Sequence, residues 1–266
     1  MVKGLYAAYT GMVEEQRRLD VLSNNLANSD TVGFKKEGTV NQAFRKQLAL
    51  RIKDSGNYMT AKGVGDIRLG DKVGEVYTNY DQGSFKITDV PSDIAISGKG
   101  FFAISHTNKA GERSIKYTRD GNFTVDVNGY LRTGTGDYVL NQYGATNSSN
   151  TEGNFVKVNP LKPYSIGQDG SIIQNNTVVG NVGLVDFNNY DYITKFGDNL
   201  YEVKEGVGII PATATLEQGV LETSNVNVID EMVNMITIQR AYEAGQKMIQ
   251  TEDMTLEQAA TNVGKV

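Results

Sequence analysis

The two ends of this 266-residue chain repeat apolar residues at alternating steps of three and four, the spacing of a helix that packs along one seam. This repeat predicts an N-terminal helix from Lys3 to about Asn28, roughly 39 Å long at 1.5 Å per residue. Only one polar residue interrupts the seam, which comprises Leu5, Ala8, Met12, Glu15, Leu19, Leu22 and Leu26.

The C-terminal segment carries a longer repeat of the same kind. Asn227, with Asp230 three residues on, is typical of a helix start, because an asparagine side chain accepts from free N–H groups of the first turn. A helix that continues to Val263 spans roughly 55 Å, about 16 Å more than the first helix. The stripe comprises Val228, Met232, Met235, Gln239, Tyr242, Gln246, Ile249, Asp253, Leu256, Ala260 and Val263, widened by Ile229, Val233 and Ile236.

Two arrangements satisfy these stripes. In the simpler one, both helices pack on the rest of the chain or on each other. In the other, the length difference leaves apolar surface on the longer helix, and adaptable methionines there suit contacts with several neighbours. We expect the second arrangement, with self-association through the ends. Leu19, Leu22 and Leu26 should pair with the early part of the C-terminal stripe, Met232, Met235 and Ile236.

Between the two ends the sequence changes to short alternating runs separated by Asp-Gly and Asn-Gly turns, which predict antiparallel strands. The fold class expected is therefore α+β, with two long terminal helices in a coiled-coil domain and a central, mainly antiparallel β domain. The expected boundaries are 1–34 for the N-terminal helix, 35–75 for a connecting arm, 76–220 for the β domain and 221–266 for the C-terminal helix.

Composition excludes several classes of function. The net charge is −5 and the basic residues are scattered, which does not favour nucleic-acid binding. No run approaches the roughly 20 apolar residues of a membrane helix, and the N-terminus lacks the apolar core of a secretory signal. Cysteine is absent, so disulfides, thiolate metal sites and cysteine nucleophiles are excluded. We expect no cofactor and no metal.

Residues that could carry chemistry do not gather in the sequence. The single histidine, His106, stands in a turn-like context without a compact set of partners, which favours a surface position over a catalytic one. Asp120–Val125 begins like a calcium loop but lacks its glycine and its closing acid, and is better explained as a hairpin turn. The sequence predicts no catalytic residue. Distant strands could still bring two acids together, so a carbohydrate-active enzyme or a secreted β-domain adhesin remains an alternative.

The stretch Leu22–Lys35 combines helical leucines with asparagines, which favour caps and turns. We interpret Leu22 and Leu26 as seam residues. Asn24, Asn25 and Asn28 then lie toward faces that could hydrogen-bond to neighbouring subunits. Gly33 is the first residue that takes a left-handed conformation without steric cost.

Four blocks of this sequence resemble the bacterial flagellar rod and hook family. The first is Leu22–Asn28 with Thr31-x-Gly33-Phe34-Lys35. The next two, Asp93–Phe102 and Tyr117–Phe123, are similar to the opening of that family's β domain. The fourth is Leu221–Asn227, followed by Met232–Ile236 and Gln239–Glu243.

The resemblance implies a structural subunit that polymerises helically into the basal-body rod and transmits torque from motor to hook. It also implies paired terminal helices around an axial channel, and passage through the flagellar type III export apparatus without signal cleavage. The expected partners are copies of the same chain and other rod and hook proteins. Chain length and the Leu221–Asn227 block favour the distal rod, with a proximal rod or hook-type protein as the alternative.

The candidate functional residues are those of the helix seams and of the motif blocks, and their expected role is in helix packing and assembly. They are Leu5, Met12, Leu19, Leu22, Asn24, Asn25, Leu26, Asn28, Gly33, Phe34, Asn225, Asn227, Met232, Met235, Ile236, Arg240, Tyr242 and Ile249.

Overall fold

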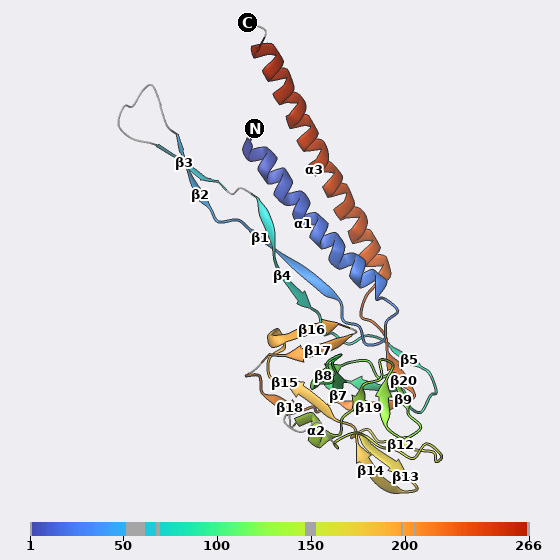
Figure 1. The fold of residues 1–266 in the computed structure, drawn as a ribbon. Helices are drawn as coiled ribbons and strands as arrows, with labels where there is room; N and C mark the ends of the chain where they lie inside the picture. The colour runs from blue at the N-terminus through green and yellow to red at the C-terminus, as the bar shows by residue number, and fades with distance from the viewer. Residues whose placement is uncertain are drawn as a thin grey trace. The chain divides into compact units, whose positions relative to one another are not determined.

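The computed structural model describes residues 2–51, 62–67, 70–146, 153–197, 199–204 and 206–264. The chain forms two compact units (Figure 1). The helical unit comprises Met1–Ala27, Lys36–Asn79 and Val226–Val266, and the β unit comprises Asn28–Lys35 and Tyr80–Asn225. An N-terminal helix, a central antiparallel β region and a C-terminal helix confirm the expected α+β class. Residues 28–34, which we assigned to the N-terminal helix, and residue 35, which we assigned to the arm, belong to the β unit.

The helical unit contains α1 (Val2–Ala27) and α3 (Val228–Val263), which lie side by side and run in opposite directions (Figure 1). The side chain of Met12 packs closely on Gly245, where an added methyl group would lie 2.7 Å from Cγ of Met12. As predicted, Asn227 caps α3, and its side chain accepts from the N–H of Ile229. Among the described helices, none is both long enough and apolar enough to cross a membrane.

The expected connecting arm consists of two antiparallel strand pairs that belong to the helical unit. β1 (Glu37–Ala43) pairs with β4 (Asp71–Thr78), and β2 (Gln47–Arg51) pairs with β3 (Lys62–Ile67). The arm is therefore extended. Residues 52–61 and 68–69 of the expected arm lie outside the described residues.

The β unit is built from antiparallel ladders around one large sheet, in the order β16-β17-β8-β7-β11-β10-β9, with β15 pairing to both β7 and β18. β19 pairs with β6, β20 pairs with β5, and β12, β13 and β14 form a separate sheet. The unit's elements are β5 (Phe85–Ile87), β6 (Ile94–Ser97), β7 (Phe101–Thr107), β8 (Arg113–Thr118), β9 (Phe123–Val125), β10 (Leu131–Thr133), β11 (Tyr138–Val139), α2 (Gln142–Thr146), β12 (Ser165–Ile166), β13 (Ser171–Gln174), β14 (Thr177–Asn181), β15 (Leu184–Phe187), η1 (Tyr190–Tyr192), β16 (Ile193–Gly197), β17 (Leu200–Val203), β18 (Ile209–Pro211), β19 (Thr215–Gln218) and β20 (Val220–Glu222).

Alternation along β7 places its side chains in two buried clusters. Phe102 and Ile104 join the first cluster, in which Phe102 meets Phe123 edge to face, with ring centroids 5.1 Å apart. Phe101 and Ala103 join the second, which is rich in aromatic rings. These two clusters give the β unit a core of its own.

Candidate assembly site

Contact between α1 and α3 runs along one stripe of each helix. On α1, the predicted seam residues Met12, Leu19, Leu22 and Leu26 are half-buried, whereas Leu5 is exposed. On α3, the predicted residues Met235, Tyr242 and Ile249 are half-buried. The less exposed stripe of α3 keeps the heptad spacing and comprises Glu231, Met235, Ile238, Tyr242, Gly245, Ile249 and Glu252.

This stripe differs from the predicted one because α3 opens with a buried acid. Glu231 is fully buried, and its Oε1 lies 2.7 Å from Nζ of Lys36, at the start of the arm. A stripe chosen by hydrophobicity passes over glutamate, and therefore selects Met232 in its place. The registers coincide again at Met235, Tyr242 and Ile249.

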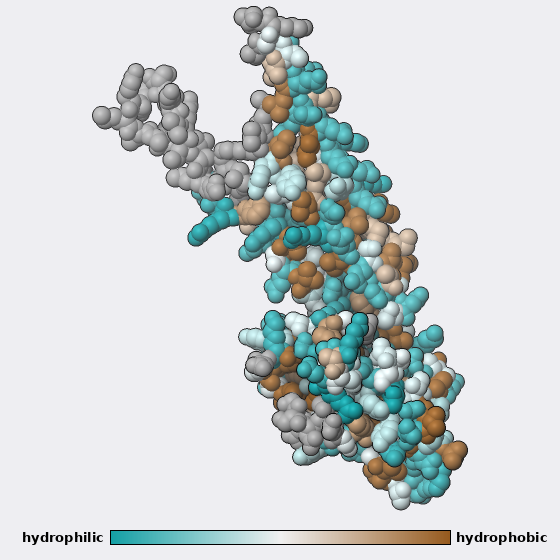
Figure 2. All heavy atoms as spheres, viewed as in Figure 1, coloured by the Kyte–Doolittle hydropathy of each residue, from teal (hydrophilic) through white to brown (hydrophobic). Residues whose placement is uncertain are grey.

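As a result, the first turns of α3 expose a row of large apolar residues, which we call the α3 apolar face. Met232 is 50% exposed and Ile236 is 49% exposed in the single chain, so their pairing with Leu19, Leu22 and Leu26 stays a prediction. Figure 2 shows apolar residues in brown along the helical unit, among hydrophilic ones. The α3 apolar face comprises Val228, Ile229, Met232, Val233 and Ile236.

The polar candidates on the helices occupy three kinds of position. Asn24 and Arg240 are exposed, and Asn227 is the exposed cap of α3. Asn25 is fully buried, and its amide forms two hydrogen bonds with the backbone of Glu37 at 2.8 and 2.9 Å. Asn25 therefore attaches the arm to α1 within one chain, and this corrects the expected bond between subunits.

Gly33 lies where the N-terminal segment crosses the β unit. Its φ is +67°, the left-handed conformation that we expected, and its N–H donates to the carbonyl of Glu222 at 2.8 Å. A methyl group at this position would lie 2.5 Å from the carbonyl carbon of Arg119. Both the conformation and the close approach of two backbones require glycine here.

Next to Gly33 lies a buried ionic cluster of Lys35, Arg119 and Glu222, which we call the charge triad. Nζ of Lys35 lies 2.6 Å from Oε1 of Glu222, and one guanidinium nitrogen of Arg119 lies 3.2 Å from Oε2. Their side chains are at most 2% exposed. Glu222 also accepts from the N–H of Gly83 at 2.9 Å.

The electrostatics of the charge triad favour a fixed structure. Two cations share one carboxylate, and backbone carbonyls supply further acceptors: Lys35 donates to Asp81, and Arg119 donates to Gly98. Burial lowers the pKa of Lys35, although Glu222 opposes this effect. Because Lys35, Arg119 and Glu222 come from three distant segments, the triad forms only when all three are in place.

The remaining candidates lie around this crossing point within the β unit. Phe34 is buried, and Nζ of Lys195 lies 4.2 Å from the centre of its ring. Asn28 accepts from the hydroxyl of Thr31, and the side chain of Asn225 donates to the carbonyl of Asp81. The motif residues named here therefore form contacts within one chain.

Sequence reasoning selected the neighbours of the charge triad but not the triad itself. Lys35, Arg119 and Glu222 each lie within one of the motif blocks that carry the family resemblance. Each stands in a block that is otherwise mainly apolar or turn-forming, although Asp120 is a second charged residue beside Arg119. The sequence does show that opposite charges occur in separate blocks. It does not show which of them pair, because pairing depends on contacts between distant parts of the chain.

His106 lies at the end of β7, and its Nδ1 is 3.1 Å from Oδ2 of Asp137. The carboxylate of Asp137 also accepts from the N–H of Thr107 and the hydroxyl of Thr135. Those bonds hold the turn between β10 and β11. Among the described residues, the side-chain partner of His106 is therefore Asp137, within this turn network.

An exposed row of large apolar residues beside a helix pair is typical of a protein–protein contact surface. Three protein-family models match this chain. The family described as "Flagella basal body rod protein" matches residues 5–35, the "Flagellar hook protein FlgE/F/G D1 domain" matches residues 95–174, and the "Flagellar basal body rod FlgEFG protein C-terminal" matches residues 217–262.

Full-length relatives extend the match over the whole chain. The flagellar basal-body rod protein FlgG of Buchnera aphidicola subsp. Schizaphis graminum is 35% identical, over 97% of this chain and 98% of the relative. FlgG of Bacillus subtilis is 34% identical over the same shares, and FlgF of Caulobacter vibrioides is 34% identical over 100% of both chains. The chain belongs to the flagellar basal-body rod protein family. This is a family of structural proteins and not of enzymes.

Proposed function

We propose that this protein is a structural subunit of the flagellar basal-body rod that polymerises helically and transmits torque from the motor to the hook. The α3 apolar face carries the proposal, because five large apolar residues on adjacent turns remain exposed in the single chain. Water contact with such a row is unfavourable, and burial against a neighbouring subunit removes it. The relatives are named as flagellar basal-body rod proteins, and we propose the basal body as the location of this chain too.

The paired helices are proposed to form the coiled-coil domain of the assembled rod. Heptad spacing of the α3 stripe and the antiparallel course of α1 and α3 support this arrangement. One stripe of α3 is used within the chain, and the α3 apolar face lies on adjacent positions of the same helix. A helix with two such surfaces can contact α1 and a neighbouring subunit at once.

Torque transmission requires subunits that do not slide past each other. Heterologous contacts repeated along an open helix give every subunit the same set of neighbours. Within each subunit, the charge triad and the Asn25 bonds hold the chain crossings in fixed positions. The partners proposed are copies of this chain, other rod and hook proteins, and the flagellar type III export apparatus, with export occurring without a cleaved signal.

Within the rod, we propose the distal position. The chain length and the Leu221–Asn227 block support it, with a proximal rod or hook-type protein as the alternative. Immunogold labelling of isolated basal bodies distinguishes the positions: label near the hook supports the distal rod, and label near the inner membrane supports a proximal one.

The assembly role is tested by placing charges on the α3 apolar face. The double substitution Met232→Asp with Ile236→Asp should abolish rod assembly and motility, because two carboxylates would be buried at a subunit contact. The folded monomer should survive, since both side chains are about half exposed. The control, Thr237→Asp with Ala244→Asp, adds equal charge to exposed positions of the same helix that lie outside both the predicted stripe and the α3 apolar face. If the first variant swam as well as the control, the proposal would fail.

A further inference from the structure

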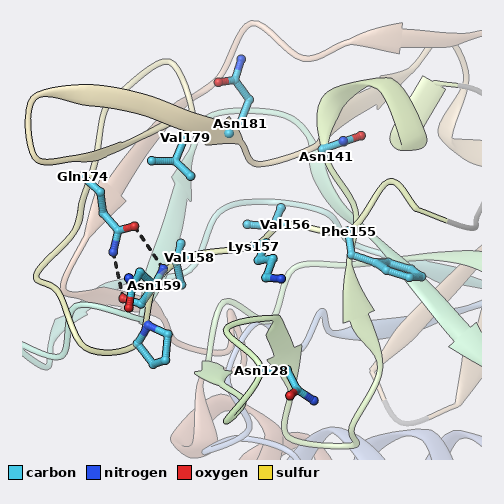
Figure 3. Close-up of a pocket in the computed structure, with 12 residues that line it drawn as sticks. Asn128, Asn141, Phe155, Val156, Lys157, Val158, Asn159, Gln174, Val179 and Asn181 are labelled. Atoms are coloured by element: carbon cyan, nitrogen blue, oxygen red, sulfur yellow. Dashed lines mark hydrogen bonds between the residues drawn. The ribbon is translucent and has the colours of Figure 1, made fainter.

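The β unit contains a groove that the assembly role does not use. Its volume is about 530 Å³, within the range of small-ligand sites. One wall is the extended segment 155–160, and the other includes the end of β14 (Figure 3). The described lining comprises Asn128, Asn141, Phe155, Val156, Lys157, Val158, Asn159, Pro160, Gln174, Val179, Gly180 and Asn181.

Carboxamides dominate the polar lining: Asn128, Asn141, Asn159, Gln174 and Asn181. No carboxylate occurs among the described lining residues, and Lys157 is the sole charged one there. A divalent cation prefers carboxylates, and a polyphosphate prefers several cations. This composition therefore favours an uncharged ligand that both donates and accepts hydrogen bonds.

Several of these amide side chains keep donor or acceptor groups that a ligand could use. The side chains of Asn128 and Asn181 are exposed and form no hydrogen bond to any other described residue. Asn141 uses its Oδ1 to accept from the N–H of Gly144, and Asn159 uses its Oδ1 to accept from the N–H of Leu161. Because a carboxamide carries two N–H donors as well as its oxygen, these two retain donors for a ligand.

The wall itself is held in place before any ligand arrives. Gln174 is buried, its Oε1 accepts from the N–H of Asn159 at 3.0 Å, and its Nε2 donates to the carbonyl of Asn159 at 2.9 Å. Figure 3 draws this pair of bonds. A wall that is already ordered reduces the entropic cost of binding.

Apolar side chains lie between the amides. Val156 and Val158 are buried beneath the segment, and Val179 on β14 is 49% exposed. In Figure 3, Asn181 and Val179 lie on one side of the segment 155–159, and Asn128 lies on the other. Val179 therefore supplies the open apolar contact, and polar groups on both sides of the segment suit an elongated ligand better than a single compact one.

We propose that this groove binds an oligosaccharide of N-acetylated amino sugars. Each acetamido group carries one N–H, one carbonyl and one methyl group. An asparagine side chain can pair with the first two, and a valine can pack against the third. Ring hydroxyls supply further partners for Asn141 and Asn159. An unacetylated glucan lacks the acetamido group, so the groove should discriminate between the two sugars.

The test compares tri-N-acetylchitotriose with cellotriose on the full-length protein by saturation-transfer NMR and isothermal titration. The acetylated sugar should bind, and cellotriose should bind at least about fivefold more weakly, the equivalent of one lost hydrogen bond. The variant Asn128→Ala with Asn181→Ala should bind tri-N-acetylchitotriose about tenfold or more weakly. Asn188→Ala, an exposed asparagine of the β unit outside the groove lining, should bind as the wild type does.

Three results would overturn the proposal: no transfer to either sugar, equal affinity for both, or unchanged affinity in the groove variant. Preferential binding of an extended peptide in the same titration would also overturn it, and would assign the groove to protein contact. Unfolding curves of each variant, which should match the wild type because both side chains are exposed, separate lost binding from lost structure.

Discussion

At the scale of residues, the structure shows which of the motif residues contact one another. Gly33, Lys35, Arg119 and Glu222 lie in three separate blocks of the sequence and meet at one buried point. The left-handed conformation of Gly33 could be predicted, because glycine after an asparagine-rich helix end is typical of it. The ion pairs could not, since periodicity carries no information on which distant charges meet.

Loss of the anion in the charge triad should be strongly destabilising. Glu222→Gln leaves Lys35 and Arg119 buried without a counter-charge, and we expect a loss of about 3–5 kcal/mol in the free energy of unfolding. Urea unfolding followed by tyrosine fluorescence measures it. Glu217→Gln, an exposed glutamate of the same unit, should change stability by less than about 0.5 kcal/mol. Equal effects of the two substitutions would show that the triad adds nothing.

Substitution of Asn25 should lower the stability of the single folded chain, because its hydrogen bonds lie within that chain. Asn25→Ala removes two hydrogen bonds to Glu37 and leaves buried backbone groups without partners, so we expect a loss of about 1–3 kcal/mol. Asn24→Ala, at the exposed neighbouring position, should cost much less. Hydrogen exchange of the Glu37 amide reports the bond directly. Unchanged protection in Asn25→Ala would contradict the contact.

Glu14 should make the helical unit sensitive to pH. Burial, together with Asp71 and Glu15, raises its pKa above 4.5, while Arg18 opposes the effect. The folded chain therefore binds a proton more readily than the unfolded chain, so this contribution is full below pH 4.5 and is lost as the pH rises through the raised pKa. Glu14→Gln should then have a higher Tm than the wild type at pH 7, and this advantage should shrink toward pH 4. A constant difference across that range would refute the assignment.

At the scale of elements, sequence patterns located both helices. The predicted helix over Lys3–Asn28 corresponds to Val2–Ala27, and the cap at Asn227 is confirmed. In the contact stripe of α3, the residues from Met235 onward were partly predicted. Glu231 was not predicted, because it is a buried glutamate paired to Lys36. The arm was predicted by position alone. Its strand pairing depends on register between distant residues, such as Glu37 with Thr78.

Two helical glycines test the contact between α1 and α3. Gly11→Ala adds a methyl group with no atom within 4 Å, so helix propensity should stabilise the chain by about 1 kcal/mol. Gly245→Ala must displace Met12, whose Cγ would lie 2.7 Å away, and the gain should be reduced or reversed. Thermal unfolding followed by far-UV circular dichroism compares them. Equal gains would mean that the helices do not pack at Gly245.

At the scale of the whole molecule, the chain leaves the helical unit after α1, crosses the β unit at residues 28–35, and returns to build the arm. A division into consecutive segments could not predict this interleaving, because it arises from Gly33 and Lys35 binding to residues near 119 and 222. Its consequence is that Lys35, near the start of the β unit, meets Glu222, near its end, at the charge triad. The β unit is therefore complete only when both segments are in place.

Electron cryo-microscopy of isolated basal bodies tests the central claim most directly. The account predicts density for this chain in the rod, in a helical array, with Met232 and Ile236 of α3 buried against a neighbouring subunit. Absence of the chain from the rod would contradict the account. So would an array in which the α3 apolar face remains exposed to solvent.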